Sequence, residues 1–246
     1  DVRRCEVLDE RVGGLFEELA RLIETLSIRD RLPQIEVAVG EAVMSLNFRV
    51  LASPSEADLA QLRSFGERHG LVLYLQPGGL DSVRPLDHFP SPPAPLPPGE
   101  REALIYRLAD GLELEFQPQH FIQINAALNR SLVERACELL EIGPEDRVLD
   151  LFCGLGNFTL ALARRAREVV GVEGEAGLVE WARRNAARNS IANAAFYAAN
   201  LAGDLTGQPW TQGGYDKVLL DPPRSGALDL MPWMATLGAR RVVYVS

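Results

Sequence analysis

The spacing of apolar and polar residues divides the chain into two parts. In residues 1–117, apolar side chains recur every three to four positions over residues 9–26, which predicts an amphipathic helix. Residues 55–69 predict a second helix that ends at Gly70. Together with short apolar runs typical of strands, they indicate a smaller α+β central domain over residues 1–117. The predicted strands span residues 35–39, 42–51, 71–75, 104–108 and 112–116, the last two forming a hairpin around Asp110-Gly111.

A proline-rich segment interrupts this first part. Residues 77–100 begin with Pro77, Gly78 and Gly79 and contain six prolines between Pro90 and Pro98. Because proline has no N–H group and a fixed φ, we expect a long surface loop here, without a helix or a central strand.

The pattern changes after Phe116. A helix over residues 126–141 is followed by strands and helices in alternation, and the strands are continuously apolar. This alternation predicts a parallel, doubly wound α/β sheet in a second domain, residues 118–246. The predicted strands span residues 147–151, 168–172, 195–198, 216–220 and 240–245, and the helices residues 157–166, 175–189 and 228–237.

Composition limits the class of protein. With 47% hydrophobic residues and only three cysteines, the chain is expected to bury a full core without a disulfide scaffold, in a reducing compartment such as the cytoplasm. No apolar run of about 18 residues predicts a membrane span. The net charge of −9 disfavours non-specific binding to phosphate backbones. The chain begins at Asp1 without a start methionine, and we expect an internal fragment of a longer, monomeric protein.

A glycine-rich turn follows the first strand of the second domain. Cys153-Gly154-Leu155-Gly156-Asn157 lies between a buried strand and a helix, where glycine lets a ligand approach the backbone. Glu173 ends the next strand, at a position that accepts hydrogen bonds from ribose hydroxyls. No third glycine brings a pyrophosphate onto the helix, which favours a nucleoside ligand such as S-adenosyl-L-methionine over a dinucleotide.

Polar residues also follow the next two strands. Asn200 is suited either to pairing with an adenine edge or to forming a turn, and both interpretations stay open. Asp221, held by Pro222 and Pro223, directs a carboxylate to the same edge of the sheet. The convergence of polar groups at successive strand ends predicts one ligand site.

These motifs resemble the bacterial RNA uracil-5-methyltransferase family, and most closely its iron–sulfur 23S rRNA branch. The resemblance implies a Rossmann-like S-adenosyl-L-methionine-dependent methyltransferase domain that methylates C5 of a uridine in 23S rRNA. It implies that Gln123, Phe152, Asn157, Glu173, Asn200 and Asp221 contact the cofactor. The motifs that carry it are FIQIN at residues 121–125, DLFCGLGNFT at 150–159, GVE at 171–173 and DPPRSG at 221–226.

The resemblance also implies parts that these 246 residues lack. In the family a cysteine thiolate adds to C6 of uracil, and this nucleophile is expected directly after Ser246. An RNA-binding barrel is expected before Asp1. Cys5 matches one ligand of the family's [4Fe–4S] cluster, but a lone cysteine does not hold one, so the cluster is expected only in the longer protein. We therefore expect this chain to bind cofactor without turnover.

Other interpretations remain. A nicotinamide oxidoreductase uses a similar sheet, and a non-catalytic binding module would share the site. A tRNA uracil-5-methyltransferase would share the family motifs. An amino-group methyltransferase also has an Asp-Pro-Pro loop, although Arg224 stands where that class has an aromatic residue. Cys137 and Cys153 are predicted to be buried structural residues. Arginines of the predicted helices, such as Arg183 and Arg188, are expected on a solvated face or on RNA phosphates.

Overall fold

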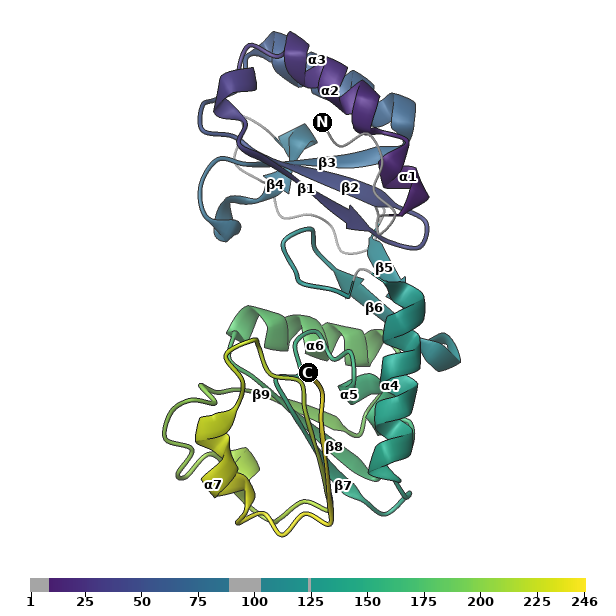
Figure 1. Ribbon diagram of the computed structural model, residues 1–246, viewed down its shortest axis with the longest axis vertical. Helices are drawn as coiled ribbons and strands as arrows, with labels where there is room; N and C mark the ends of the chain where they lie inside the picture. The colour runs from purple at the N-terminus through teal and green to yellow at the C-terminus, as the bar shows by residue number, and fades with distance from the viewer. Residues whose placement is uncertain (1–8, 89–102, 124) are drawn as a thin grey trace. The chain divides into compact units, whose positions relative to one another are not determined.

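The computed structural model describes residues 9–88, 103–123 and 125–246, which fall into two compact units (Figure 1). The N-terminal unit comprises residues up to 106 together with 116–124, and the C-terminal unit comprises residues 107–115 and 125–246. The domain boundary expected after residue 117 stays a prediction. No helix in the described ranges has the length and apolar character needed to cross a bilayer.

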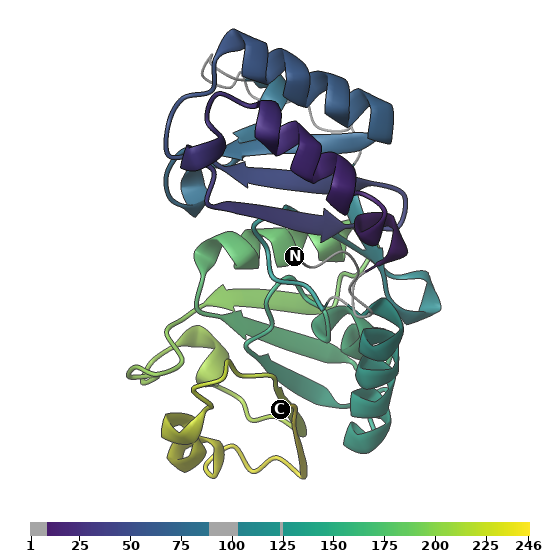
Figure 2. The ribbon, with the colours of Figure 1, turned by 45° about the horizontal axis from the view of Figure 1, so that its top comes forward.

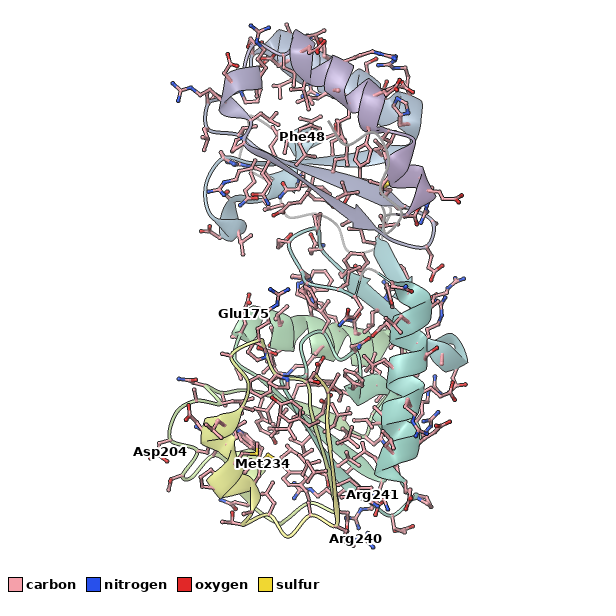
Figure 3. The ribbon with its side chains drawn as sticks, in the orientation of Figure 1. Phe48, Glu175, Asp204, Met234, Arg240 and Arg241 are labelled. Atoms are coloured by element: carbon pink, nitrogen blue, oxygen red, sulfur yellow. The ribbon has the colours of Figure 1, made fainter. Side chains whose placement is uncertain are left out.

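The N-terminal unit is a four-stranded mixed sheet in the order β1-β2-β3-β4. Strands β2 and β3 are parallel, and helix α3 connects them, whereas the outer pairs are antiparallel. Helices α2 and α3 cover one face of the sheet (Figure 2), and Phe48 is fully buried between them and the sheet (Figure 3). The elements are α1 (Glu10–Gly13), α2 (Phe16–Thr25), β1 (Gln34–Val39), β2 (Met44–Arg49), α3 (Glu56–His69), β3 (Leu71–Gln76) and β4 (Arg84–Pro85).

Two predictions in this unit need correction. The single helix expected over residues 9–26 is divided into α1 and α2 at Gly13-Gly14, because glycine weakens a helix interior. The expected loop from residue 77 contains two 3-10 turns (Leu80–Ser82 and Leu86–His88) and the short edge strand β4. Leu86 is 3% exposed and belongs to the core. Residues 89–100 of that loop lie outside the described residues.

Helix α3 begins at a well-defined cap. The Ser55 hydroxyl accepts a hydrogen bond from the backbone N–H of Asp58, and the Asp58 carboxylate accepts one from the backbone N–H of Ser55. The same carboxylate accepts from the backbone N–H and hydroxyl of Ser27. Burial alone would raise the pKa of Asp58, but these hydrogen bonds outweigh burial and lower it to about 2.

The predicted hairpin is confirmed. Strands β5 (Leu104–Arg107) and β6 (Glu113–Phe116) form a two-stranded sheet joined by a 3-10 turn at Ala109–Gly111. Asp110 has φ of 57° and Gly111 has φ of 72°, so both occupy the left-handed region. Aspartate and glycine are the residues that adopt this backbone conformation at low cost, as the sequence predicts.

The C-terminal unit contains the predicted parallel doubly wound sheet. Its strand order is β11-β10-β7-β8-β9, and every neighbouring pair is parallel. The chain starts in β7, continues outward through β8 and β9, and then returns to β10, so the strand order reverses beside β7. The elements are α4 (Ala126–Leu140), β7 (Arg147–Leu151), α5 (Thr159–Ala163), β8 (Glu168–Glu173), α6 (Ala176–Arg188), β9 (Ala194–Ala198), β10 (Lys217–Leu220), α7 (Met231–Met234) and β11 (Arg241–Tyr244).

Successive side chains along each strand of this sheet point to its two opposite faces. Leu149 and Leu151 of β7 join a core with Trp210 and Leu230 on one face. Asp150, between them, therefore points to the opposite face. The helix predicted over residues 228–237 is divided into a 3-10 turn (Leu228–Leu230) and α7, because Pro232 in the first turn of α7 lacks the N–H that a continuous helix needs.

Candidate functional site

Three carboxylates gather where β7, β8 and β10 end. Asp150 is the penultimate residue of β7, Glu173 is the last residue of β8, and Asp221 directly follows β10. Since β7 pairs with both other strands in parallel, their carboxyl ends meet at one edge. The charges of Glu173 and Asp221 both raise the pKa of Asp150, so the three groups interact electrostatically.

The glycine-rich turn after β7 has a backbone that is open to a ligand. Phe152, Gly154 and Gly156 have φ values of 65°, 52° and 95°. A Cβ added at Gly154 would meet no atom within 4 Å, so there is free space above this residue. A positive φ at a bulky residue such as Phe152 is strained, and such strain is concentrated at functional sites. This backbone fits the close approach of a ligand.

Glu173 is fixed by the backbone around it. One carboxylate oxygen accepts a hydrogen bond from the N–H of Gly154 at 3.0 Å, and the other accepts from Gly174 at 2.6 Å and Glu175 at 3.2 Å. The side chain therefore joins the end of β8 to the glycine turn after β7. Carboxylate oxygens have further lone pairs, so this arrangement leaves acceptor capacity for ribose hydroxyls.

Asp150 is a buried carboxyl group with one unsatisfied oxygen. The residue is 0% exposed, and its Oδ2 accepts a hydrogen bond from the hydroxyl of Thr159. Its Oδ1 has no hydrogen-bond partner among the described residues. The pKa of Asp150 is raised to about 7: burial is the largest cause, the hydrogen bonds from Thr159 partly offset it, and the charges of Asp221 and Glu173 raise it further.

Asp221 is held at the end of β10 beside β7. Its backbone N–H donates to the carbonyl of Leu151 at 3.3 Å, and Pro222 and Pro223 stiffen the chain immediately after it. Burial raises the pKa of this carboxyl above its ordinary value. Asp221 thus has a fixed backbone and a partly desolvated side chain at the same edge as Glu173.

The two ends of this sheet differ in how their acidic residues are compensated. At the amino ends of the strands, Arg240 pairs with Asp146 at 2.7 Å and with Asp216 at 3.0 Å. At the carboxyl ends, no ion pair to Asp150, Glu173 or Asp221 is found within the described ranges. Figure 3 shows Arg240 and Glu175 at these opposite ends. These site carboxylates have no ion pair to a described cationic side chain, which favours a positively charged ligand.

The other predicted site residues have different surroundings. Asn157 exchanges two hydrogen bonds with Asn129 of α4, at 2.8 and 3.1 Å, so its amide is already engaged. Asn200 is exposed, and its Oδ1 accepts from the backbone N–H of Ala202 at 3.1 Å, which supports the turn-forming interpretation. Gln123 is exposed and belongs to the N-terminal unit, so its role stays a prediction.

Sequence reasoning assigns no role to several residues that build this site. Asp150 enters it only as part of the turn motif, although an acidic residue inside the apolar run of β7 is itself a signal. Asn185 of α6 is 0% exposed and donates to the carbonyl of Leu155 in the glycine turn at 3.1 Å. Nothing in the local pattern distinguishes Asn129 or Asn185 from other helical asparagines.

The two described cysteines, Cys137 and Cys153, do not form a metal or nucleophile site. Cys137 and Cys153 are 2% and 3% exposed, and burial raises the pKa of both thiols, so the predicted structural role fits. Cys5 lies outside the described residues. The residues that the structure describes contain no group of three His, Cys, Asp or Glu side chains suited to a metal, and they do not fit an iron–sulfur cluster.

Helix-face arginines contact acidic side chains of their own unit. Arg188 pairs with Glu115, and Arg183 pairs with Glu180 and donates to the carbonyl of Phe196 at 2.6 Å. These contacts support the interpretation of a solvated helix face.

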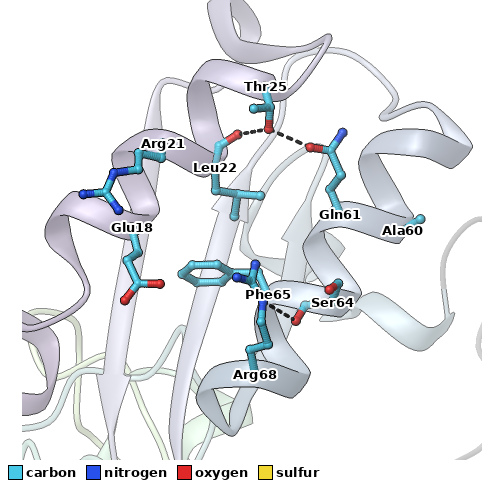
Figure 4. A pocket seen from close by; sticks show the side chains of 9 residues that line it. All are labelled: Glu18, Arg21, Leu22, Thr25, Ala60, Gln61, Ser64, Phe65 and Arg68. Atoms are coloured by element: carbon cyan, nitrogen blue, oxygen red, sulfur yellow. Dashed lines mark hydrogen bonds between the residues drawn. The ribbon is translucent and has the colours of Figure 1, made fainter.

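A separate groove lies within the N-terminal unit, between α2 and α3 (Figure 4). Its volume is about 490 Å³, and none of the residues predicted from the sequence lines it. Figure 4 shows Arg21, Glu18 and Arg68 around Phe65, a mixed lining without a concentration of one charge. The groove contributes nothing to the strand-end site.

Comparison with known proteins identifies relatives along the whole chain. The sequence profile described as tRNA (uracil-5-)-methyltransferase matches residues 108–246. The chain is 52% identical over 247 aligned residues to a protein of Alkalilimnicola ehrlichii, and 48% identical to one of Stenotrophomonas maltophilia, both named 23S rRNA (uracil(1939)-C(5))-methyltransferase RlmD. Each alignment covers 100% of this chain and 53% of the relative, so the chain spans about half their length.

A solved structure shares the fold over nearly the whole chain. It is the Pyrococcus abyssi tRNA (uracil-54, C5)-methyltransferase in complex with S-adenosyl-L-homocysteine, with a TM-score of 0.68 and 20% sequence identity. The similarity covers 99% of this chain and 59% of that one. The predicted Rossmann-like methyltransferase fold, preceded by a smaller α+β part, is therefore confirmed.

Proposed function

Because the chain belongs to the tRNA (uracil-5-)-methyltransferase family, we propose that its C-terminal unit binds S-adenosyl-L-methionine at the carboxyl ends of β7, β8 and β10. The observation that carries this proposal is the Glu173 carboxylate, fixed by three backbone N–H groups beside the open glycine turn. A nucleoside ribose fits this acceptor, and the uncompensated negative charge suits a cationic cofactor.

We propose that the longer protein methylates C5 of a uridine in 23S rRNA, as the names of its relatives suggest. Bound S-adenosyl-L-methionine would supply the methyl group from a positively charged sulfonium. Glu173 holds the ribose, and the glycine turn lets the cofactor lie against the backbone. Asp221 and its two prolines form the rigid floor at which the uracil meets the methyl group. A uridine in folded RNA has to leave its stack to reach this floor.

This chain is expected to bind the cofactor without transferring the methyl group. The reaction needs a thiolate that adds to C6 of uracil and makes C5 nucleophilic. Both described cysteines are buried with raised pKa values, which makes them unsuited to this role. The family resemblance implies that the nucleophile follows Ser246 in the longer protein. The [4Fe–4S] cluster, the RNA-binding barrel, the cytoplasmic location and the monomeric state of that protein remain predictions.

Two alternative functions have less support from the described residues. A nicotinamide oxidoreductase would need a glycine that brings the pyrophosphate onto the helix, whereas Asn157 occupies that region with its amide paired to Asn129. An amino-group methyltransferase would need an aromatic residue after the Asp-Pro-Pro sequence, where this chain has the exposed Arg224.

Calorimetric titration with S-adenosyl-L-methionine and, separately, NAD⁺ tests the proposal. We expect only the former to bind, and we expect Glu173→Ala to weaken binding by about 1–3 kcal/mol, the scale of lost charge-assisted hydrogen bonds. Glu175→Ala is the matched control, because this exposed neighbour contributes only its backbone N–H to the site. An unchanged dissociation constant for Glu173→Ala, or binding of NAD⁺ alone, would refute the assignment.

A further inference from the structure

The inference concerns the proton on Asp150, and it rests on the proposed cofactor site. Asp150 is fully buried, receives one hydrogen bond from Thr159, and leaves Oδ1 without a partner among the described residues. An ionised carboxylate in this position would be a desolvated charge with donors from a single described residue, Thr159, and with one oxygen unsatisfied, which is strongly unfavourable. A neutral carboxyl avoids this cost in the cofactor-free protein.

The groups that face Asp150 do not compensate a negative charge. Glu173 at the end of β8 and Asp221 after β10 are acidic, and Cys153 in the turn is a buried thiol. Cys137 of α4 interacts with Asp150, and Glu134 of α4 and Arg165, just after α5, act on Cys137 in turn. Arg165 is already paired with Glu134 at 3.7 Å. Every neighbouring charge that acts on Asp150 therefore favours its protonated form, in keeping with a pKa near 7.

A cationic ligand reverses this balance. S-adenosyl-L-methionine carries a sulfonium and an ammonium group, and the proposed site places it at the edge formed by Asp150, Glu173 and Asp221. An opposite charge at close range favours the ionised form of a carboxyl group. We propose that Asp150 is protonated in the cofactor-free protein and releases its proton to solvent when the cofactor binds, so that a positive charge of the cofactor replaces the proton.

Asp150 is thereby a positioning residue whose ionisation is coupled to binding. The coupling makes affinity depend on pH, because only the deprotonated form matches the bound cofactor. Affinity is expected to fall about tenfold between pH 8 and pH 6, as Asp150 becomes protonated in the free protein. The released proton appears in the buffer, with no other bond made or broken.

Titration calorimetry of the whole chain with S-adenosyl-L-methionine tests this in buffers of different ionisation enthalpy. The dependence of the observed heat on the buffer gives the number of protons released per cofactor. We expect a release of about one proton at pH 6, about half a proton at pH 7 and almost none at pH 8.5. The same titration of Asp150→Asn is the reference. Any proton released by the cofactor's own amino group appears in both proteins, so the difference between them is the release from Asp150. We expect Asp150→Asn to lack that part of the release.

Two further variants separate this role from a merely structural one. Thr159→Val removes the hydrogen bond that favours the ionised form, so proton release should persist to higher pH. Glu145→Gln, an exposed carboxylate before the opposite end of β7, should release the same number of protons as the unaltered chain.

The outcomes distinguish the two proposals. Cofactor binding with equal heats in all buffers at pH 6 would overturn this inference and leave the proposed function standing. The same proton release in Asp150→Asn would also overturn it. Absence of cofactor binding at every pH would overturn the proposed function and the inference together.

Discussion

Two aspartate side chains of this protein have opposite pKa shifts, because burial and hydrogen bonding balance differently at each. Asp58 is buried, but Ser27 and Ser55 surround it with donors, and its pKa falls to about 2. Asp150 is buried, the donors found for it in the described residues all belong to Thr159, and its pKa rises to about 7. At Asp58 the hydrogen bonds outweigh the effect of burial on the pKa, whereas at Asp150 burial outweighs the hydrogen bonds. Asp58 therefore stabilises a helix, whereas Asp150 remains available to a ligand.

The raised pKa of Asp150 predicts how the stability of the cofactor-free protein depends on pH. A carboxyl that binds its proton more tightly when folded contributes full stability below its unfolded pKa of about 3.9, and loses it as pH rises toward 7. An asparagine side chain cannot ionise, so Asp150→Asn should gain stability relative to the unaltered chain as pH rises, by on the order of 4 kcal/mol between low pH and pH above 7. Thermal unfolding at pH 5 and pH 8 measures the difference.

The control for this experiment is Glu145→Gln, which removes an exposed carboxylate near the other end of the same strand. Its melting temperature should follow that of the unaltered chain at both pH values. A difference between Asp150→Asn and the unaltered chain that is the same at pH 5 and pH 8 would contradict the account of Asp150.

At the scale of elements, two asparagines at the end of α6 attach strand β6 to the C-terminal unit. Asn189 accepts from the backbone N–H of Glu113 at 2.8 Å and donates to its carbonyl at 2.7 Å. Asn185 makes the same pair of bonds to Glu115, at 2.8 and 3.1 Å. The side-chain amides thus make the same kind of hydrogen bonds to the backbone of β6 that a neighbouring strand would make. Asn185 also reaches the glycine turn, so β6 and the cofactor turn share one support.

Removing one of these amides should loosen β6 locally. Asn189→Ala leaves the N–H and carbonyl of Glu113 without their partners, and we expect a cost of about 1–3 kcal/mol in local stability. Hydrogen exchange of the Glu113 amide should accelerate by about 5- to 150-fold, since about 1.4 kcal/mol corresponds to a factor of ten. The Glu115 amide, held by Asn185, should change less.

Asn193→Ala is the matched control for Asn189→Ala. Its amide donates to the carbonyls of Ala163, Ala166 and Arg167, so this variant also removes side-chain hydrogen bonds from the C-terminal unit. Exchange at Glu113 should be unchanged in it. Equal acceleration at Glu113 in both variants would show general destabilisation instead of a specific clamp.

The sequence predicts elements well where periodicity alone defines them. Strands such as β7 and β8, with continuous apolar residues, lie where the pattern puts them. Boundaries differ where a single residue interrupts the backbone, as at Gly13-Gly14 and Pro232, because an apolar stripe can continue across a break in hydrogen bonding. The burial of Leu86 depends on tertiary packing, which no local pattern contains.

At the scale of the whole molecule, each unit has a core of its own, and the strand-end site is built within the C-terminal one. The reversal of strand order beside β7 brings together residues that are far apart in sequence, Asp150 and Asp221 among them. Strand-end positions such as Glu173 are predictable from the alternation of elements. The pairings of Asn157 with Asn129 and of Asn185 with Leu155 are not, because they depend on how helices pack.

The most direct test of the central claim is a crystal structure of the chain with S-adenosyl-L-homocysteine. We predict that the ribose hydroxyls lie within hydrogen-bond distance of the Glu173 carboxylate, with the sulfur near the carboxyl ends of β7 and β10. A ligand bound elsewhere at full occupancy, or an empty strand-end edge at saturating concentration, would contradict the account.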